Sequence, residues 1–112
     1  ALIERRIKSA FRKMAKEFEL IGDIRGRGVL LGIEFVSDRE KKTSANSATR
    51  KIFDYCFNKG LIFQIRGTRG LQNVIRLVPP MTTTKPELDR ALSILYDSIK
   101  NASRLKRRGR VN

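Results

Sequence analysis

The chain has 112 residues, of which 32% are charged and 40% hydrophobic, and its formal net charge is +14. This length suits one globular domain with a modest core, and the composition excludes an intrinsically disordered chain. No apolar run approaches the roughly 18 residues that a membrane span needs, so no membrane association is expected. The charged residues at the start of the chain argue against a secretory signal peptide.

Cys56 is the only cysteine, so no disulfide can form within the chain. A reducing, cytoplasmic location is therefore expected. A catalytic thiol needs a base such as histidine, and the chain contains no histidine. We therefore predict that Cys56 is a buried, unreactive residue on a helix face.

The first third of the chain predicts a helix followed by a strand. Apolar residues recur at steps of three and four over residues 2–19, which indicates an amphipathic helix. Glycines punctuate residues 22–28 and predict a tight turn into a strand over residues 29–36. Asp23 is interpreted as a turn residue and Glu34 as a surface charge on the strand, with nothing to hold the two together.

The middle of the chain predicts one helix and two strands. The helix covers residues 44–59, and Gly60 follows its last turn, where a left-handed cap residue belongs. Branched apolar residues predict strands over residues 61–65 and 74–78, separated by a loop over residues 66–73 that contains two glycines.

The last predicted helix covers residues 85–100, because Thr84 and Glu87 have the spacing of a capping box. The order of the elements predicts an α+β fold. We expect a two-layer sandwich in which a three-stranded, mainly antiparallel sheet is covered by helices. Residues 1–100 are expected to form this domain, and residues 101–112 are expected to be a basic, disordered tail.

Four segments carry motifs in a fixed order: IGDIRGRGVLLGIEF at residues 21–35, KGLI at 59–62, VIRLVPPM at 74–81 and TTTKPELD at 82–89. Together they resemble the GDVRGxGLMxGIE, xGLL, IRxxPPL and TITxEELD motifs of class III pyridoxal-phosphate-dependent aminotransferases. Members of this family act on ornithine, acetylornithine, 4-aminobutyrate or diaminobutyrate. The resemblance covers about residues 2–100 and implies the C-terminal small domain of such an enzyme.

The resemblance implies a homodimeric parent enzyme that transfers an amino group between an amino acid or ω-amino acid and a 2-oxo acid. In this family, the large domain carries the lysine that forms a Schiff base with pyridoxal phosphate and the aspartate that pairs with the pyridine nitrogen. No lysine of this chain stands in a matching context. The chain alone is therefore expected to be inactive and to bind no cofactor, with no catalytic, cofactor-binding or metal-binding residue of its own.

Arg76 is the candidate substrate-binding residue. It stands among apolar strand residues, so it must face solvent, an acid or an anionic ligand. Residue types alone favour an exposed arginine on an edge strand. The resemblance favours an arginine that holds a substrate carboxylate with its two-pronged guanidinium. Arg66 and Arg69 are weaker candidates for this role, because their surroundings lack the family's RPxG pattern, and a solvated loop charge is the preferred interpretation of both.

A free-standing basic module that binds nucleic acid or another polyanion is the alternative function. Residues 101–112 hold five basic residues and no acid. No aromatic residue interrupts them to stack on bases, so a solvated tail is the preferred interpretation. Gly26 and Gly28 do not form a phosphate-binding loop either, because their spacing is wrong and a strand follows them.

Overall fold

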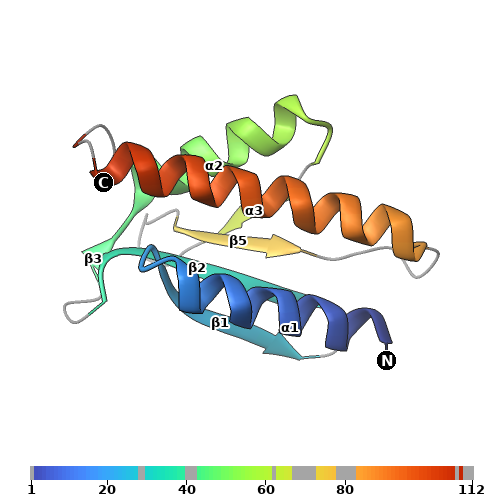
Figure 1. The fold of residues 1–112 in the computed structure, drawn as a ribbon. Helices are drawn as coiled ribbons and strands as arrows, with labels where there is room; N and C mark the ends of the chain where they lie inside the picture. Colours follow the sequence, from blue (N-terminus) through green and yellow to red (C-terminus); the bar gives the residue numbers. More distant parts are fainter. Residues whose placement is uncertain are drawn as a thin grey trace.

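The computed structural model describes residues 2–27, 30–39, 43–61, 63–66, 73–77, 83–107 and 109. The helices in these ranges are α1 (Leu2–Glu17), α2 (Asn46–Asn58) and α3 (Lys85–Arg107). The strands are β1 (Ile21–Arg27), β2 (Leu30–Asp38), β3 (Thr43–Ser44), β4 (Gln64–Arg66) and β5 (Val74–Leu77). Figure 1 shows α3 running alongside β5, and α1 running along the sheet beside β1.

The strands form one antiparallel sheet in the order β1-β2-β5-β4, and the short β3 pairs with the end of β2. The register aligns one apolar row across all four main strands, made of Ile24, Ile33, Ile75 and Ile65. Ile33 and Ile75 are fully buried. Because side chains alternate between the faces of a strand, this row marks the face that the core covers.

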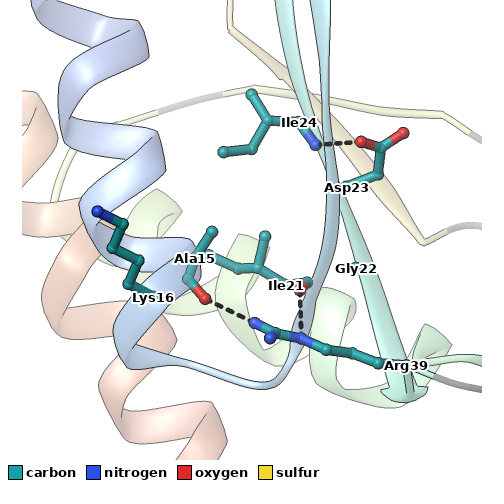
Figure 2. Close-up of a pocket in the computed structure, with 7 residues that line it drawn as sticks. All are labelled: Ala15, Lys16, Ile21, Gly22, Asp23, Ile24 and Arg39. Carbon is teal, nitrogen blue, oxygen red and sulfur yellow. Dashed lines mark hydrogen bonds between the residues drawn. The ribbon is translucent and has the colours of Figure 1, made fainter.

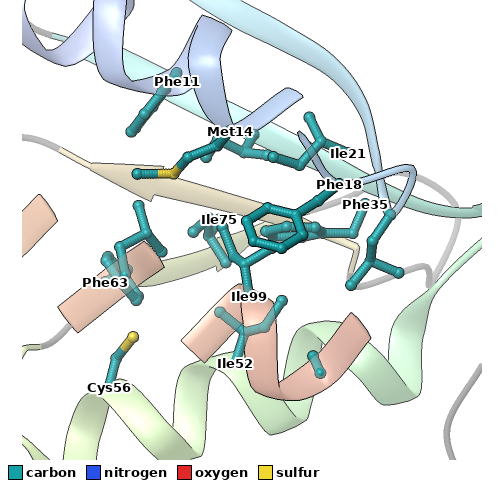
Figure 3. Close-up of a cluster of buried hydrophobic side chains, with 14 of the residues drawn as sticks. Phe11, Met14, Phe18, Ile21, Phe35, Ile52, Cys56, Phe63, Ile75 and Ile99 are labelled. Atoms are coloured by element: carbon teal, nitrogen blue, oxygen red, sulfur yellow. The ribbon is translucent and has the colours of Figure 1, made fainter. Parts of the chain in front are cut away.

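All three helices pack their apolar stripes against this face (Figure 3). Phe11 and Met14 come from α1, Ile52 from α2 and Ile99 from α3, and each is at least 96% buried. Burying one such side chain stabilises the fold by about 1.5–3 kcal/mol. None of the helices in the described part of the chain is long and apolar enough to cross a membrane.

Two local features mark the ends of helices: a capping box at the start of α3 and a left-handed glycine after α2. At the start of α3, the Glu87 N–H donates to Thr84 Oγ1 at 3.3 Å, and the Thr84 N–H donates to Glu87 Oε1 at 3.0 Å. This reciprocal pair is the predicted capping box. Gly60 follows α2 with a φ of 87°, which confirms the predicted left-handed cap residue.

The predicted α+β sandwich is confirmed, and strands lie at or near all three predicted positions. Two further strands, β1 and β3, widen the sheet. Asp23 was expected in a turn, but it lies in β1, where its carboxylate accepts a hydrogen bond from the Ile24 N–H at 2.9 Å. The strand expected over residues 61–65 is observed over residues 64–66 instead, where its backbone pairs with β5.

The tail prediction is corrected over residues 101–107, which continue α3. This last part of the helix is attached to the domain, because Ala102 is buried in the core and the Lys106 ammonium donates to the Ser37 carbonyl oxygen at 2.6 Å. The basic residues Arg108 and Arg110 lie outside the described residues. The division into a domain and a tail stays a prediction.

Candidate carboxylate-binding site

The face of the sheet opposite the core carries polar and charged positions. Gly32 of β2 lies directly opposite Arg25 of β1 on one side and Arg76 of β5 on the other. Gln64 of β4 continues the row beyond Arg76. Directly opposed residues share a face. By backbone pairing, one row across the sheet therefore consists of Arg25, Gly32, Arg76 and Gln64.

Arg76 occupies an interior strand, because β5 lies between β2 and β4. The interpretation as an edge-strand arginine is therefore wrong. Its side chain is partly buried, and in the part of the chain that the structure describes it makes no hydrogen bond and no ion pair. A partly buried guanidinium without an acid is unfavourable unless an anion pairs with it. The strand thus presents a fork of donors that suits a carboxylate.

The other two candidate arginines are placed differently. Arg66 was expected in a loop, but its backbone lies in β4, paired with Val74. Arg69 lies outside the described residues. The substrate-binding roles of Arg76, Arg66 and Arg69 stay predictions.

The neighbouring row brings together two acids that sequence reasoning left apart. Asp23 and Glu34 are directly opposed across β1 and β2, so the expectation that nothing holds them together is wrong. Each also takes part in another polar or electrostatic interaction.

A hollow of about 420 Å³ lies beside the end of α1 (Figure 2). Among its charged lining residues, Arg39 is already used by the backbone. Its guanidinium donates to the carbonyl oxygens of Ala15 at 2.6 Å, Phe18 at 3.0 Å and Ile21 at 3.1 Å. These carbonyl groups lie between the last turn of α1 and the first residue of β1. Arg39 is therefore a structural clamp that holds the end of α1 to the start of β1. Sequence reasoning missed Arg39, because its contacts are 18 to 24 residues away.

The described residues of this chain do not fit pyridoxal phosphate by themselves. Every lysine that the structure describes lies in a helix or at a helix end, and no described strand contains one. An amine to form a Schiff base is thus missing from the face that carries Arg76. Among the described residues, no group of three or more His, Cys, Asp or Glu side chains is placed to hold a metal ion.

Cys56 matches its prediction as a buried residue. It is fully buried in α2, and burial raises the pKa of its thiol to about 11, partly opposed by a hydrogen bond with Ser98. A thiol with such a pKa is almost entirely protonated near neutral pH. Cys56 therefore belongs to the core and not to a reactive site.

The fold agrees with the comparisons of sequence. Residues 1–99 match the aminotransferase class-III family. The chain belongs to the class III aminotransferase family. It is 38% identical over 89 residues to alanine–glyoxylate aminotransferase 2 homolog 2 of Arabidopsis thaliana, which covers 80% of this chain and 18% of that protein. It is 40% identical over 87 residues to a leucine/methionine racemase of Thermococcus litoralis, covering 78% of this chain and 19% of the relative.

Solved structures agree with this assignment. The adenosylmethionine-8-amino-7-oxononanoate aminotransferase of Methanocaldococcus jannaschii superposes with a TM-score of 0.71 at 35% identity, over 88% of this chain and 23% of the other. The PMP-bound aminotransferase of Vibrio fluvialis gives a TM-score of 0.74 at 26% identity, over 89% and 22%. The chain thus spans less than a quarter of these relatives. The alternative of a nucleic-acid-binding module has no support in these comparisons.

Proposed function

We propose that this chain is the C-terminal small domain of a pyridoxal-phosphate-dependent aminotransferase and that Arg76 holds the substrate carboxylate. The parent enzyme would transfer an amino group between an amino acid or ω-amino acid and a 2-oxo acid. The observation that carries the role of Arg76 is its place on an interior strand, partly buried and without an acid partner among the described residues. Family membership supports the reaction class.

The chain's own contribution is binding and orientation. Arg76 would grip the carboxylate with two parallel N–H donors, which fixes the direction in which the rest of the substrate extends. The sheet around β5, packed on a buried core, fixes the position of the Arg76 backbone. Pyridoxal phosphate, held by a large domain outside this sequence, would supply the electron sink for the amino-group chemistry.

The relatives define the main competing reactions. Their names include a leucine/methionine racemase and an (R)-1-hydroxy-2-aminoethylphosphonate ammonia-lyase besides aminotransferases. Transamination is the proposal here because the family and both named structures are aminotransferases. Product analysis distinguishes transamination from racemisation. Transamination converts the donor to a 2-oxo acid and aminates the acceptor, whereas racemisation forms no oxo product.

The proposal includes three properties of the parent enzyme. It would be a homodimer, as the family resemblance implies, and its small domain would pack against the missing large domain. Its location would be cytoplasmic, which the single, buried Cys56 favours. The isolated chain would neither bind pyridoxal phosphate nor catalyse transamination, because none of its lysines stands in the Schiff-base context of the family.

The test compares an amino acid with its decarboxylated amine as donors for the full-length enzyme. Arg76→Ala should lower kcat/KM for the amino acid about tenfold to a hundredfold, because a charged hydrogen bond is worth about 1.5–3 kcal/mol. Arg76→Lys should lower it less, since lysine keeps the charge and loses the fork. The amine should hardly change.

Arg12→Ala is the matched control, because Arg12 is exposed on α1, whose apolar side packs on the other face of the sheet. Equal losses for both donors would mean that Arg76 supports the fold rather than the substrate. No loss for either donor would move the role to Arg66 or Arg69.

A further inference from the structure

A groove lies between the starts of α1 and α3, apart from the sheet row of Arg76. Its volume is about 580 Å³, within the range of roughly 300–1,000 Å³ that is typical of binding pockets. Ile3 of α1 and Leu88 of α3 give it apolar walls, and both belong to the edge of the core. Apolar surface of this kind is stabilised when another apolar group covers it.

The charged side chains that line this groove, among the described residues, are all basic. They are Arg5 and Arg6 of α1 and Lys85 of α3. Arg6 is already paired, because its Nε donates to Asp89 Oδ1 at 2.6 Å. In the part of the chain that the structure describes, Arg5 and Lys85 make neither a hydrogen bond nor an ion pair. Two cations are therefore left for an acidic partner.

The other acids in the first turns of these helices are also engaged within the domain. Glu4 forms an ion pair with Lys8 at 2.9 Å. Glu87 accepts hydrogen bonds from the Thr84 hydroxyl at 2.7 Å and from the Thr84 N–H at 3.0 Å. The described part of the domain thus leaves the groove with apolar walls and a basic rim. An occupant of matching chemistry carries an apolar side chain flanked by carboxylates.

The groove and Arg76 lie toward the same end of the domain. Figure 1 shows the starts of α1 and α3 at one end of the molecule, and the arrow of β5 points toward that end. Arg76 is the third residue of β5. In the proposed function, a large domain holds the cofactor near Arg76. This requirement brings the large domain to the end of the small domain where the groove lies.

We infer that an acidic, partly apolar segment of the parent enzyme's large domain fills this groove, with its carboxylates beside Arg5 and Lys85. The inference rests on the proposed function, because it takes the partner to be the cofactor-holding domain. The chain spans less than a quarter of its relatives, so most of the parent's surface lies outside it. Contacts of this kind are anchored by an apolar group in a pocket and oriented by charges at its rim. The groove would thereby set the position of Arg76 relative to the cofactor.

The first experiment measures whether the groove is covered in the parent enzyme. Ser9 lines the groove and is exposed in this chain. The thiol of Ser9→Cys should react with a maleimide at least about tenfold more slowly in the full-length enzyme than in the 112-residue chain, because a covered site reacts only when the contact opens. Ser93→Cys is the matched control, since Ser93 is exposed on α3 away from the groove. It should react equally fast in both proteins.

The second experiment tests the charge of the occupant. Arg5→Glu combined with Lys85→Glu, in full-length Ser9→Cys enzyme, should restore fast labelling because like charges then face each other. The kcat/KM values for the amino acid and for its decarboxylated amine should fall together, since the whole small domain is displaced. Arg12→Glu combined with Lys100→Glu is the control, because these exposed residues lie on the same helices outside the groove. It should change neither labelling nor kcat/KM.

The outcomes separate this inference from the proposed function. If Ser9→Cys labels equally fast in both proteins while Arg76→Ala still discriminates between the donors, the inference is overturned and the proposed function stands. If Arg76→Ala does not discriminate, the proposed role of Arg76 fails, whatever the labelling shows. Protection that survives the charge reversal would overturn the acidic occupant. Protection of the 112-residue chain that rises with its concentration would mean that a second copy fills the groove, and would overturn the large-domain occupant.

Discussion

Asn73 and Phe35 exchange two hydrogen bonds across 38 residues of sequence. The Phe35 N–H donates to the Asn73 carbonyl oxygen at 2.8 Å, and Asn73 Nδ2 donates to the Phe35 carbonyl oxygen at 3.1 Å. Asn73 is 5% exposed and directly precedes β5. This pair therefore fixes where β5, and with it Arg76, begins along β2.

Asn73→Ala should lower the free energy of unfolding by about 0.5–1.5 kcal/mol. The cost stays moderate because the Phe35 carbonyl oxygen still accepts a hydrogen bond from the Ala45 N–H at 3.2 Å. Urea denaturation measures the loss. Asn58→Ala, an exposed position at the end of α2, is the control and should change stability by less than about 0.5 kcal/mol. An Asn73 variant as stable as the control would contradict this role.

Arg39→Lys should destabilise the domain by about 1–3 kcal/mol. One ammonium group cannot reach the three carbonyl oxygens of Ala15, Phe18 and Ile21 that the guanidinium contacts. Hydrogen exchange should also become faster at the end of α1 and the start of β1. Arg12→Lys serves as the comparison, and equal stability of the two variants would refute the clamp.

Glu87 should make stability depend on acid pH. Its hydrogen bonds with the Thr84 hydroxyl and N–H lower the pKa of the carboxyl group from its ordinary value of 4.5. The stabilisation is therefore fully present above pH 4.5 and is lost as the pH falls through the lower pKa of the folded state. Unfolding curves between pH 2 and 7 test this. The difference between wild type and Glu87→Gln should shrink on acidification, and a constant difference would argue against it.

Cys56 should react slowly with thiol reagents in the native domain. Burial raises its pKa to about 11 from 9.0, so the folded state favours the protonated thiol. This contribution to stability is present below pH 9.0 and is lost as the pH rises through about 11. Labelling with an uncharged alkylating reagent at pH 8 should follow the rate of local unfolding and accelerate in urea. Rapid labelling without denaturant would show that the thiol is accessible.

Local patterns predicted the helices well and the sheet less completely. The apolar stripes of α1 and α2 and the capping box of Thr84 and Glu87 involve residues close in sequence, so they can be read directly. β1 was missed because its glycines suggest a turn, whereas its hydrogen bonds come from β2. Arg76 could be selected from its motif, but its neighbour Gly32 could not, because only the register of β2 and β5 brings the two together.

Gly22 is required because a side chain at this position would collide with Val36, and a double-mutant cycle should show it. The β1–β2 register shifts between Ile21 and Asp23, and a Cβ at position 22 would lie 2.6 Å from Val36 Cγ1. Val36 is 99% buried and cannot simply turn away. Gly22→Ala should therefore cost about 1–3 kcal/mol, as overpacking does.

Val36→Ala alone should also destabilise the domain, because it removes buried methyl groups. In the double variant the new methyl group occupies part of the space that Val36 vacates. The combined loss should therefore be smaller than the sum of the single losses, by at least about 0.5 kcal/mol. Gly32→Ala combined with Val36→Ala is the comparison. A Cβ at position 32 would meet Ile75 and Val74 but no atom of Val36. The stability changes of these two single variants should therefore add in the double variant. Strict additivity for the Gly22 pair would contradict the contact with Val36. The register shift between Ile21 and Asp23 would then account for the stability lost in Gly22→Ala.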